Sequence, residues 1–206
     1  MARWVCFDIG GVMVEIAQTW ADALKTAALA PGRNDLPGML PELDVMNRYQ
    51  SGEATYPEYL AGMADALGIT AEAADRVHRH ILKREYPGIA DLVADLRTQG
   101  ISTSCLSNTN APHWEDLTDP AKFPTVAGLS ACHASHLFRL GKPDPAIYRA
   151  FEAAVGAEPG DIVFFDDNLR NVEVANECGW RAYRIDPFGD PPAAMRAHLR
   201  DIGWLG

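Results

Sequence analysis

The chain has 206 residues, 48% apolar and 22% charged, and this balance indicates a soluble globular protein. A formal charge of −10 disfavours nucleic acid and anionic membranes as main partners, because both are negatively charged. The sequence shows neither a membrane-length apolar run nor the pattern of a signal peptide, so we expect a cytoplasmic protein. Four widely spaced cysteines without a CxxC pair predict reduced, mostly buried thiols.

The first predicted element is a buried strand over residues 3–9, RWVCFDI. Asp8 stands at the end of this apolar run, and Gly10 and Gly11 follow it as a turn. An apolar run of this length that ends in glycine is typical of a strand in a parallel sheet.

Helical signals dominate the next segment, residues 16–84. Thr55 and Glu58 form a capping-box pair at the start of one predicted helix, and Gly68 can end it. A second helix is predicted from Thr70 towards residue 82. The segment is therefore predicted to be all-helical.

Helices and strands alternate from residue 87 onward. The predicted elements are a helix from 89 closed by Gly100, a strand at 101–107, a weaker strand at 130–138, a helix from 145 to about 155, a strand at 161–167, a helix at 169–178, a strand at 180–186 and a helix between 192 and 200. Repeated units of this kind predict an α/β fold with a Rossmann-like parallel sheet.

This order predicts two domains. Residues 1–15 and 85–206 form the α/β core, and residues 16–84 form a small helical cap inserted after the first strand. Because such sheets bind ligands at the carboxyl ends of their strands, an insertion at this point is placed to cover the site. In the cap, core or surface packing is the expected role of the aromatic residues, Trp20, Tyr49 and Tyr56.

Polar residues stand where the predicted core strands end. They are Asp8 after the first strand, Ser107, Asn108 and Thr109 after the second, Lys142 in the loop after residues 135–140, and Asp166 with Asp167 after the strand at 161–167. Since the carboxyl ends of parallel strands meet at one edge of a sheet, we expect these side chains to lie close together.

These residue types suit phosphoryl transfer. The Asp8 carboxylate can attack phosphorus and form an acyl phosphate, which makes it the candidate nucleophile. With Asp166 and Asp167 it carries a formal charge of −3, and a divalent ion held by oxygen atoms would offset the repulsion. Mg²⁺ fits such a site, and the Lys142 ammonium brings the formal sum to zero.

Phosphate oxygens also need hydrogen-bond donors. Ser107, the backbone amides around Asn108, and the amides of the Gly10–Gly11 turn can supply them. Each residue alone also has a structural explanation, because Ser107 and Asn108 can cap a helix and Lys142 can be a solvated surface charge. Their joint occurrence at successive strand ends favours a functional site.

Four stretches resemble the motifs of the haloacid dehalogenase (HAD) superfamily, namely FDIGGV, LSNTN, GKPDPAIY and FFDDNLRNVEVAN. Within the superfamily, LSNTN followed by His113, the FFDDN stretch and the helical insertion look closest to the α-D-glucose-1-phosphate phosphatase type. The resemblance implies a HAD-like core with a helical cap and a bound Mg²⁺.

The resemblance also implies roles for individual residues. Asp8 corresponds to the nucleophile, Ser107 and Lys142 to phosphate binders, and Asp166 to a magnesium ligand. Asp167 corresponds to an additional ligand or to a residue behind the ligands. Asn171 corresponds to an orienting residue.

Gly10 departs from the pattern of most phosphatases of this superfamily. They carry a second aspartate there, which serves as general acid and base and gives its backbone carbonyl to the magnesium. Gly10 keeps the carbonyl and lacks the side chain, and proton transfer of this kind contributes about 10²–10⁴-fold to rate.

Three interpretations of Gly10 stay open. The enzyme is active because its substrate has a weakly basic leaving oxygen, as an anomeric sugar phosphate does, and the resembling sugar-phosphate phosphatase type also has Asp-x-Gly here. Alternatively, the missing group is replaced by Glu15 or by His113, which is also a candidate residue for binding the substrate or its phosphate. In the third interpretation chemistry has been lost and the pocket only binds a phosphorylated ligand.

The sequence therefore predicts a Mg²⁺-dependent phosphatase that hydrolyses a small phosphomonoester, preferably a sugar phosphate, through a phospho-Asp8 intermediate. The alternatives are a catalytically impaired phosphate-binding or interaction protein and a 2-haloacid dehalogenase. The presence of both Asp166 and Asp167 disfavours the dehalogenase, whose aspartate attacks carbon without a divalent metal. The expected partner is a small phosphorylated metabolite, and the sequence gives no oligomeric state.

Overall fold

Two units make up the computed structural model, which describes residues 3–40, 43–50 and 53–206. We call Met1–Glu15 with Arg84–Gly206 the core unit, and Ile16–Lys83 the helical unit. Residues 1–2 of the predicted core and residues 41–42 and 51–52 of the predicted cap lie outside the described residues. That the inserted segment serves as a cap stays a prediction.

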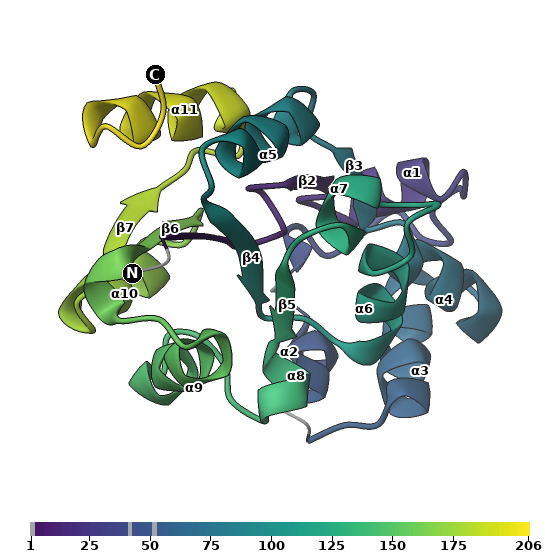
Figure 1. Ribbon diagram of the computed structural model, residues 1–206. Coiled ribbons are helices and arrows are strands. Elements are labelled where there is room, and N and C mark those ends of the chain that lie inside the picture. The colour runs from purple at the N-terminus through teal and green to yellow at the C-terminus, as the bar shows by residue number, and fades with distance from the viewer. Residues whose placement is uncertain (1–2, 41–42, 51–52) are drawn as a thin grey trace. The chain divides into compact units, whose positions relative to one another are not determined.

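A five-stranded parallel sheet forms the centre of the core unit, in the order β5-β4-β1-β6-β7 (Figure 1). Its strands are β1 (Trp4–Phe7), β4 (Ser102–Ser107), β5 (Ala131–Ala134), β6 (Ile162–Asp166) and β7 (Arg181–Arg184). All of β6 and most of β1 are buried, as expected of central strands that are covered on both faces. The predicted α/β fold with a parallel sheet is therefore confirmed.

Helices cover this sheet on both sides, with α5 and α11 on one side and α9 and α10 on the other (Figure 1). The helices of the core unit are α5 (Ile89–Thr98), α6 (Ala111–Leu117), α7 (Pro124–Ala127), α8 (Ser135–Phe138), α9 (Pro145–Val155), α10 (Leu169–Glu177) and α11 (Pro191–Asp201), with a 3₁₀ turn at Pro159–Asp161. As predicted, α9 begins at residue 145, and its N-cap is Asp144, whose side chain accepts a hydrogen bond from the Ala146 amide.

The helical unit contains α1 (Trp20–Thr26), α2 (Asp44–Gln50), α3 (Tyr56–Leu67) and α4 (Ala71–Arg79). The capping box predicted for α3 is present between Thr55 and Glu58, and Gly68 ends the helix in the left-handed region at φ 68°. Trp20 is fully buried in the core of this unit, and Tyr49 and Tyr56 pack against the same cluster. The packing role predicted for these aromatic residues is confirmed.

The strand predicted at 130–138 is wrong beyond Ala134. The register of β5 with β4 pairs Ala134 with Ser107, which is the last residue of β4. Beyond this pair β5 has no neighbouring strand to continue the ladder among the described residues, and the chain turns into α8. The length of β5 is therefore set by β4 rather than by its own sequence.

The prediction that 16–84 is all-helical is wrong at both ends. Strands β2 (Val14–Ile16) and β3 (Leu82–Glu85) form a separate two-stranded sheet. The Ala17 amide donates to the Ile81 carbonyl at 2.9 Å, so the two ends of the inserted segment are hydrogen-bonded to each other. The second predicted helix accordingly ends at Arg79, before the chain becomes extended.

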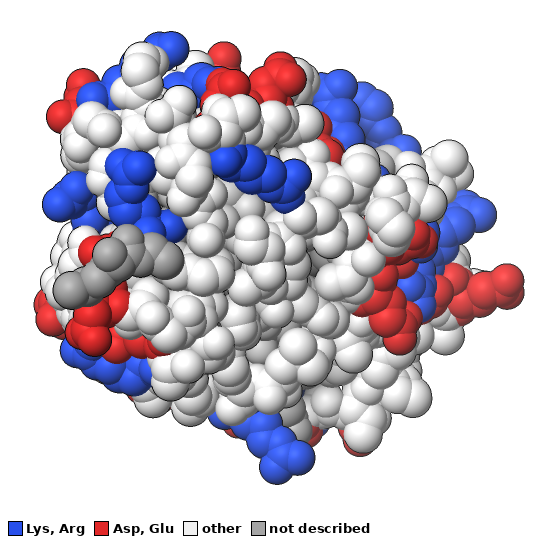
Figure 2. All heavy atoms as spheres, in the orientation of Figure 1, with Lys and Arg blue, Asp and Glu red and all other residues white. Residues whose placement is uncertain are grey.

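Charged side chains of both signs are scattered over the face of the molecule in Figure 2, where Lys and Arg stand in separate groups, several of them beside Asp or Glu. That the protein does not bind nucleic acid stays a prediction. All four cysteines are free thiols, and three of them are buried, whereas Cys132 is partly exposed. Among residues 3–40, 43–50 and 53–206, no helix is long and apolar enough to cross a membrane.

Candidate active site

Three neighbouring strands of the core sheet place one predicted site residue each at their carboxyl ends. Asp8 follows directly after β1, Ser107 is the last residue of β4, and Asp166 is the last residue of β6. Because β1 pairs with both β4 and β6, these strand ends are adjacent. The fold thus brings together residues that are far apart in sequence.

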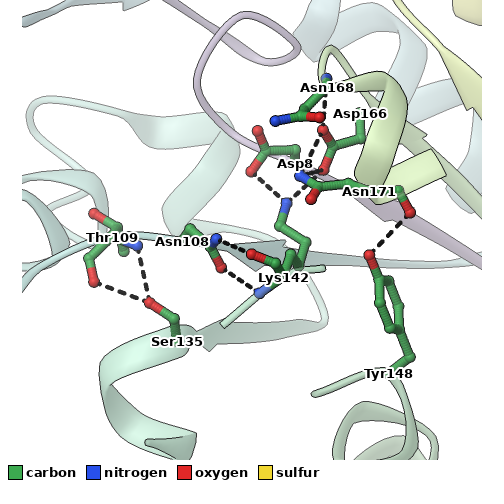
Figure 3. Close-up of polar contacts among 9 residues, drawn as sticks. All are labelled: Asp8, Asn108, Thr109, Ser135, Lys142, Tyr148, Asp166, Asn168 and Asn171. Carbon is green, nitrogen blue, oxygen red and sulfur yellow. Dashed lines mark hydrogen bonds and ion pairs between the residues drawn. The ribbon is translucent and has the colours of Figure 1, made fainter. Parts of the chain in front are cut away.

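Lys142 connects two of the predicted acids (Figure 3). Its Nζ atom lies 2.9 Å from Oδ1 of Asp8 and donates to Oδ2 of Asp166 at 2.6 Å. The side chain is 1% exposed, and its ammonium also lies over the Phe164 ring, 5.2 Å from the ring centre. The alternative explanation of Lys142 as a solvated surface charge is therefore excluded by its burial.

Asp166 is held by several donors besides Lys142 (Figure 3). The Asn168 amide donates to Oδ1 at 2.8 Å, and Nδ2 of Asn171 lies 3.0 Å from both carboxylate oxygens. The Tyr148 hydroxyl donates to the Asn171 carbonyl at 2.9 Å and so fixes the residue that orients the carboxylate. These contacts fit the orienting role that the resemblance implied for Asn171.

Asp167 completes a cluster of three acids. Asp8, Asp166 and Asp167 each offer a carboxylate oxygen within 4.8 Å of the other two. Gly11 lies against this cluster with φ +76°, and a β-carbon there would be only 2.8 Å from Oδ2 of Asp167. The positive φ favours a glycine at position 11, and a larger residue there would also have to displace the Asp167 carboxylate.

The cluster holds more negative than positive charge, and this shifts the pKa values of its members. Burial raises the pKa of Asp8 to about 7, the charges of Asp166 and Asp167 raise it as well, and the Lys142 ammonium opposes them. Burial also raises the pKa of Asp167 above its ordinary value, followed by repulsion from Asp166. Burial alone would lower the pKa of Lys142, but the carboxylates of Asp8 and Asp166 raise it above its usual range.

The other predicted donors lie around this cluster. Ser107 is buried at the end of β4, and Gly10 lies in the turn between Asp8 and Gly11. The Asn108 side chain is directed at the main chain of Lys142, with Nδ2 donating to the carbonyl at 2.7 Å and Oδ1 accepting from the amide at 2.8 Å. The sequence predicted backbone donors at Asn108 and did not predict this contact.

The two candidates for replacing the missing acid and base lie on different elements. His113 is buried on α6, where its amide donates to the N-cap side chain of Asn110 at 3.1 Å. Glu15 lies on β2 and accepts a hydrogen bond from Nε of Arg84 at 2.9 Å. A role in proton transfer stays a prediction for both.

Two further contacts at the site were missed by sequence analysis. Tyr148 lies within the quoted GKPDPAIY stretch, but nothing in its pattern shows that it reaches Asn171. Ser135 joins its hydroxyl to both the amide and the carbonyl of Thr109, at 3.1 and 3.2 Å, and so holds the chain that follows β4 (Figure 3). Both link segments that are distant in sequence.

Known proteins resemble this chain in sequence and in fold. It is 28% identical over 115 residues to (S)-2-haloacid dehalogenase 4A of Burkholderia cepacia, covering 56% of this chain and 49% of that protein. The chain therefore spans about half the length of this relative. It is 26% identical over 190 residues to the N-acetylmuramic acid 6-phosphate phosphatase of Pseudomonas aeruginosa, covering 88% of this chain and 80% of that protein.

A solved structure shows the same fold. A HAD family enzyme from Bacteroides thetaiotaomicron, in complex with magnesium and inorganic phosphate, matches with a TM-score of 0.74 and 22% identity, covering 95% of this chain and 100% of that one. The family model described as haloacid dehalogenase-like hydrolase matches residues 2–179. This chain therefore belongs to the haloacid dehalogenase-like hydrolase family.

Proposed function

We propose that this hydrolase is a Mg²⁺-dependent phosphatase that acts on a small phosphomonoester through a phosphorylated Asp8. The observation that carries the proposal is the cluster in which three carboxylates meet beside one buried lysine. Three acids and one ammonium leave a formal charge of −2 in a mostly buried site, and a divalent cation would neutralise it.

The residues present fit Mg²⁺. The candidate ligands are oxygen atoms of Asp8, Asp166 and Asp167 and the carbonyl of Gly10, and hard cations of this kind prefer oxygen. Among the described residues, the buried Oδ1 atom of Asn171 accepts no hydrogen bond. An acceptor without a donor, in a residue that contacts the Asp166 carboxylate, fits a hydrated cation, because coordinated water donates hydrogen bonds.

The proposed reaction has two steps. An Asp8 carboxylate oxygen attacks phosphorus, the bond from phosphorus to the leaving oxygen breaks, and that oxygen takes a proton from solvent or from a nearby acid. Water then attacks phosphorus, the bond to Asp8 breaks, and inorganic phosphate leaves. Lys142 offsets negative charge at Asp8 and at the transferring group throughout, while Ser107 and the backbone amides beside it bind phosphate oxygens. Bound magnesium would supply further charge neutralisation.

Gly10 favours substrates whose leaving oxygen needs little help from an acid. Phosphoryl transfer depends mainly on positioning and charge stabilisation when the leaving group is a weak base. The anomeric oxygen of a sugar phosphate meets this condition, and the resemblance to the α-D-glucose-1-phosphate phosphatase type points to the same class. The relative from P. aeruginosa is also named for a sugar phosphate, but one that carries its phosphate at position 6 and not at the anomeric carbon, so it supports the sugar-phosphate class and not the anomeric position. A small phosphorylated metabolite of the cytoplasm is therefore the proposed substrate.

A dehalogenase is the second candidate, because one relative is named as an (S)-2-haloacid dehalogenase. In that reaction Asp8 would attack carbon and release a halide ion. Three convergent carboxylates are unsuited to it, since two of them would repel a carboxylate substrate in the absence of a cation. The same acids are useful where a divalent ion is bound, which favours the phosphatase.

Release of phosphate from p-nitrophenyl phosphate with Mg²⁺ tests the proposal. Asp8→Asn should abolish turnover, whereas the control Asp116→Asn, which replaces another buried aspartate that is paired with a lysine, should retain it. Equal activity in wild type and Asp8→Asn would refute the nucleophile. Chloride release from 2-chloropropionate, without phosphate release, would establish the dehalogenase. Stabilisation by phosphorylated ligands without any turnover would favour a binding protein.

A further inference from the structure

The contact between Asn108 and Lys142 is not explained by phosphate binding alone. The Asn108 carboxamide donates to the Lys142 carbonyl at 2.7 Å and accepts from the Lys142 amide at 2.8 Å (Figure 3). The two residues are 34 positions apart, so the pair ties the end of β4 to the loop before α9. Both polar atoms of the Asn108 side chain are engaged with one residue.

We call these two hydrogen bonds the clamp. They hold the main chain of Lys142, whereas the ammonium group that contacts the acids is at the end of the side chain. Its Nζ atom lies between Asp8 and Asp166, 2.9 and 2.6 Å from their oxygens. A lysine side chain has several rotatable bonds, and its ammonium stays between two carboxylates only at a cost in conformational entropy. The clamp fixes the amide and the carbonyl of Lys142 and so restricts the position of its Cα atom. Less conformational entropy is then lost when the side chain places its ammonium between the two acids.

We propose that Asn108 is a positioning residue that holds Lys142 in place between Asp8 and Asp166. The inference rests on the proposed function, in which the Lys142 ammonium stabilises charge during phosphoryl transfer. A displacement of about 1 Å in such a group can cost about 10²-fold in rate. The competing explanation is that Asn108 contacts the substrate directly and that its contact with Lys142 is incidental.

A matched control occurs elsewhere in the core unit. Asn176 makes the same kind of reciprocal pair with Ala182, with Nδ2 donating to the carbonyl at 3.2 Å and Oδ1 accepting from the amide at 3.0 Å. Both asparagines are exposed, so replacing either leaves the hydrophobic core intact. Of the two, Asn108 alone clamps a residue that contacts the acid cluster. If Asn108→Ala loses activity and Asn176→Ala does not, the loss is due to the position of Lys142 and not to the removal of a structural hydrogen bond in general.

The test is a double-mutant cycle measured with p-nitrophenyl phosphate and Mg²⁺. Asn108→Ala should lower kcat/KM by roughly 10–100-fold, whereas Asn176→Ala should leave it unchanged. In the Lys142→Ala background, Asn108→Ala should change kcat/KM by less than about twofold, because the residue that it positions is gone. An equal loss in both backgrounds would overturn the proposal in favour of direct substrate contact, and so would an unaffected Asn108→Ala.

A second readout does not depend on turnover. In crystal structures of Asn108→Ala and Asn108→Asp, Lys142 Nζ should leave hydrogen-bond distance of Asp8, Asp166 or both. The first change removes the clamp, and the second replaces its amide donor with a carboxylate oxygen that would face the Lys142 carbonyl. Retention of both contacts in both variants would contradict the proposal. If the wild type lacks phosphatase activity while the ammonium still moves in these variants, the proposed function fails and the positioning role stands.

Discussion

Two polar clusters, one in each unit, differ in whether their polar and charged groups find partners within the cluster. In the helical unit, the Tyr56 hydroxyl donates to Asp75 at 2.5 Å, and the hydroxyl of buried Tyr59 is hydrogen-bonded to His78 Nδ1 at 3.0 Å. These partners satisfy one another within the cluster. In the core unit, three carboxylates meet beside one ammonium that contacts only two of them, and the pKa of Asp8 rises to about 7 as a result of burial and repulsion.

The difference indicates that the cluster in the helical unit serves packing and the cluster in the core unit serves chemistry. A cluster whose polar groups are paired stabilises its own unit and needs nothing else. A buried cluster with surplus charge costs stability and persists where a ligand compensates it. Under the proposed function, a bound cation compensates the surplus charge of the acid cluster, so variants in the two clusters should behave in opposite ways.

The largest effect is expected from Lys142→Met. Loss of the ammonium leaves two buried carboxylates without their cation, so kcat/KM should fall by about 10²–10³-fold and stability by about 3–5 kcal/mol. Lys122→Met is the control, because Lys122 pairs with a single buried carboxylate, that of Asp116, through a half-exposed side chain, and this variant should therefore cost less stability than Lys142→Met. Urea denaturation and steady-state kinetics measure both. Similar losses in the two variants would show that the Lys142 ammonium does not supply this additional stabilisation of the acid cluster.

Asp167→Asn should have opposite effects on magnesium binding and on stability. Removing one of three repelling charges should lower magnesium affinity by about 10–100-fold and yet raise the melting temperature of the metal-free protein. Titration calorimetry with Mg²⁺ and a thermal melt in EDTA test the two halves. A variant that melts lower without metal would show that the cluster carries no surplus charge.

Tyr59→Phe tests the paired cluster of the helical unit. Loss of the hydroxyl leaves His78 without this hydrogen bond in a buried position and should cost about 1–2 kcal/mol in the free energy of unfolding. Magnesium affinity should stay at the wild-type value. A change in magnesium affinity would contradict the proposal that the cluster in the helical unit serves packing alone.

The smallest effect is expected from Thr55→Ala at the start of α3. This change removes one side of the capping box and should cost about 1 kcal/mol. Chemical denaturation should detect it, with turnover of p-nitrophenyl phosphate unchanged. Stability equal to that of the wild type would mean that the cap contributes nothing measurable to α3.

Sequence patterns predicted which residues stand at adjacent strand ends, because apolar runs end where their strands end. Asp8, Ser107 and Asp166 follow directly from that rule and from the adjacency of parallel strands. The boundary of β5 could not be predicted, because the length of β4 sets it. The Asn108 contact could not be predicted either, since it depends on where a loop 34 residues away passes the end of β4.

The most direct test of the account is whether Asp8 becomes phosphorylated. Wild-type protein is mixed with p-nitrophenyl phosphate and Mg²⁺, quenched in acid, digested, and the peptide that contains Asp8 is analysed by mass spectrometry. We predict a phosphoryl group on Asp8 that hydroxylamine removes and that is missing in EDTA and in Asp8→Asn. Turnover with the phosphoryl group on another residue, or with none on Asp8, would contradict the account.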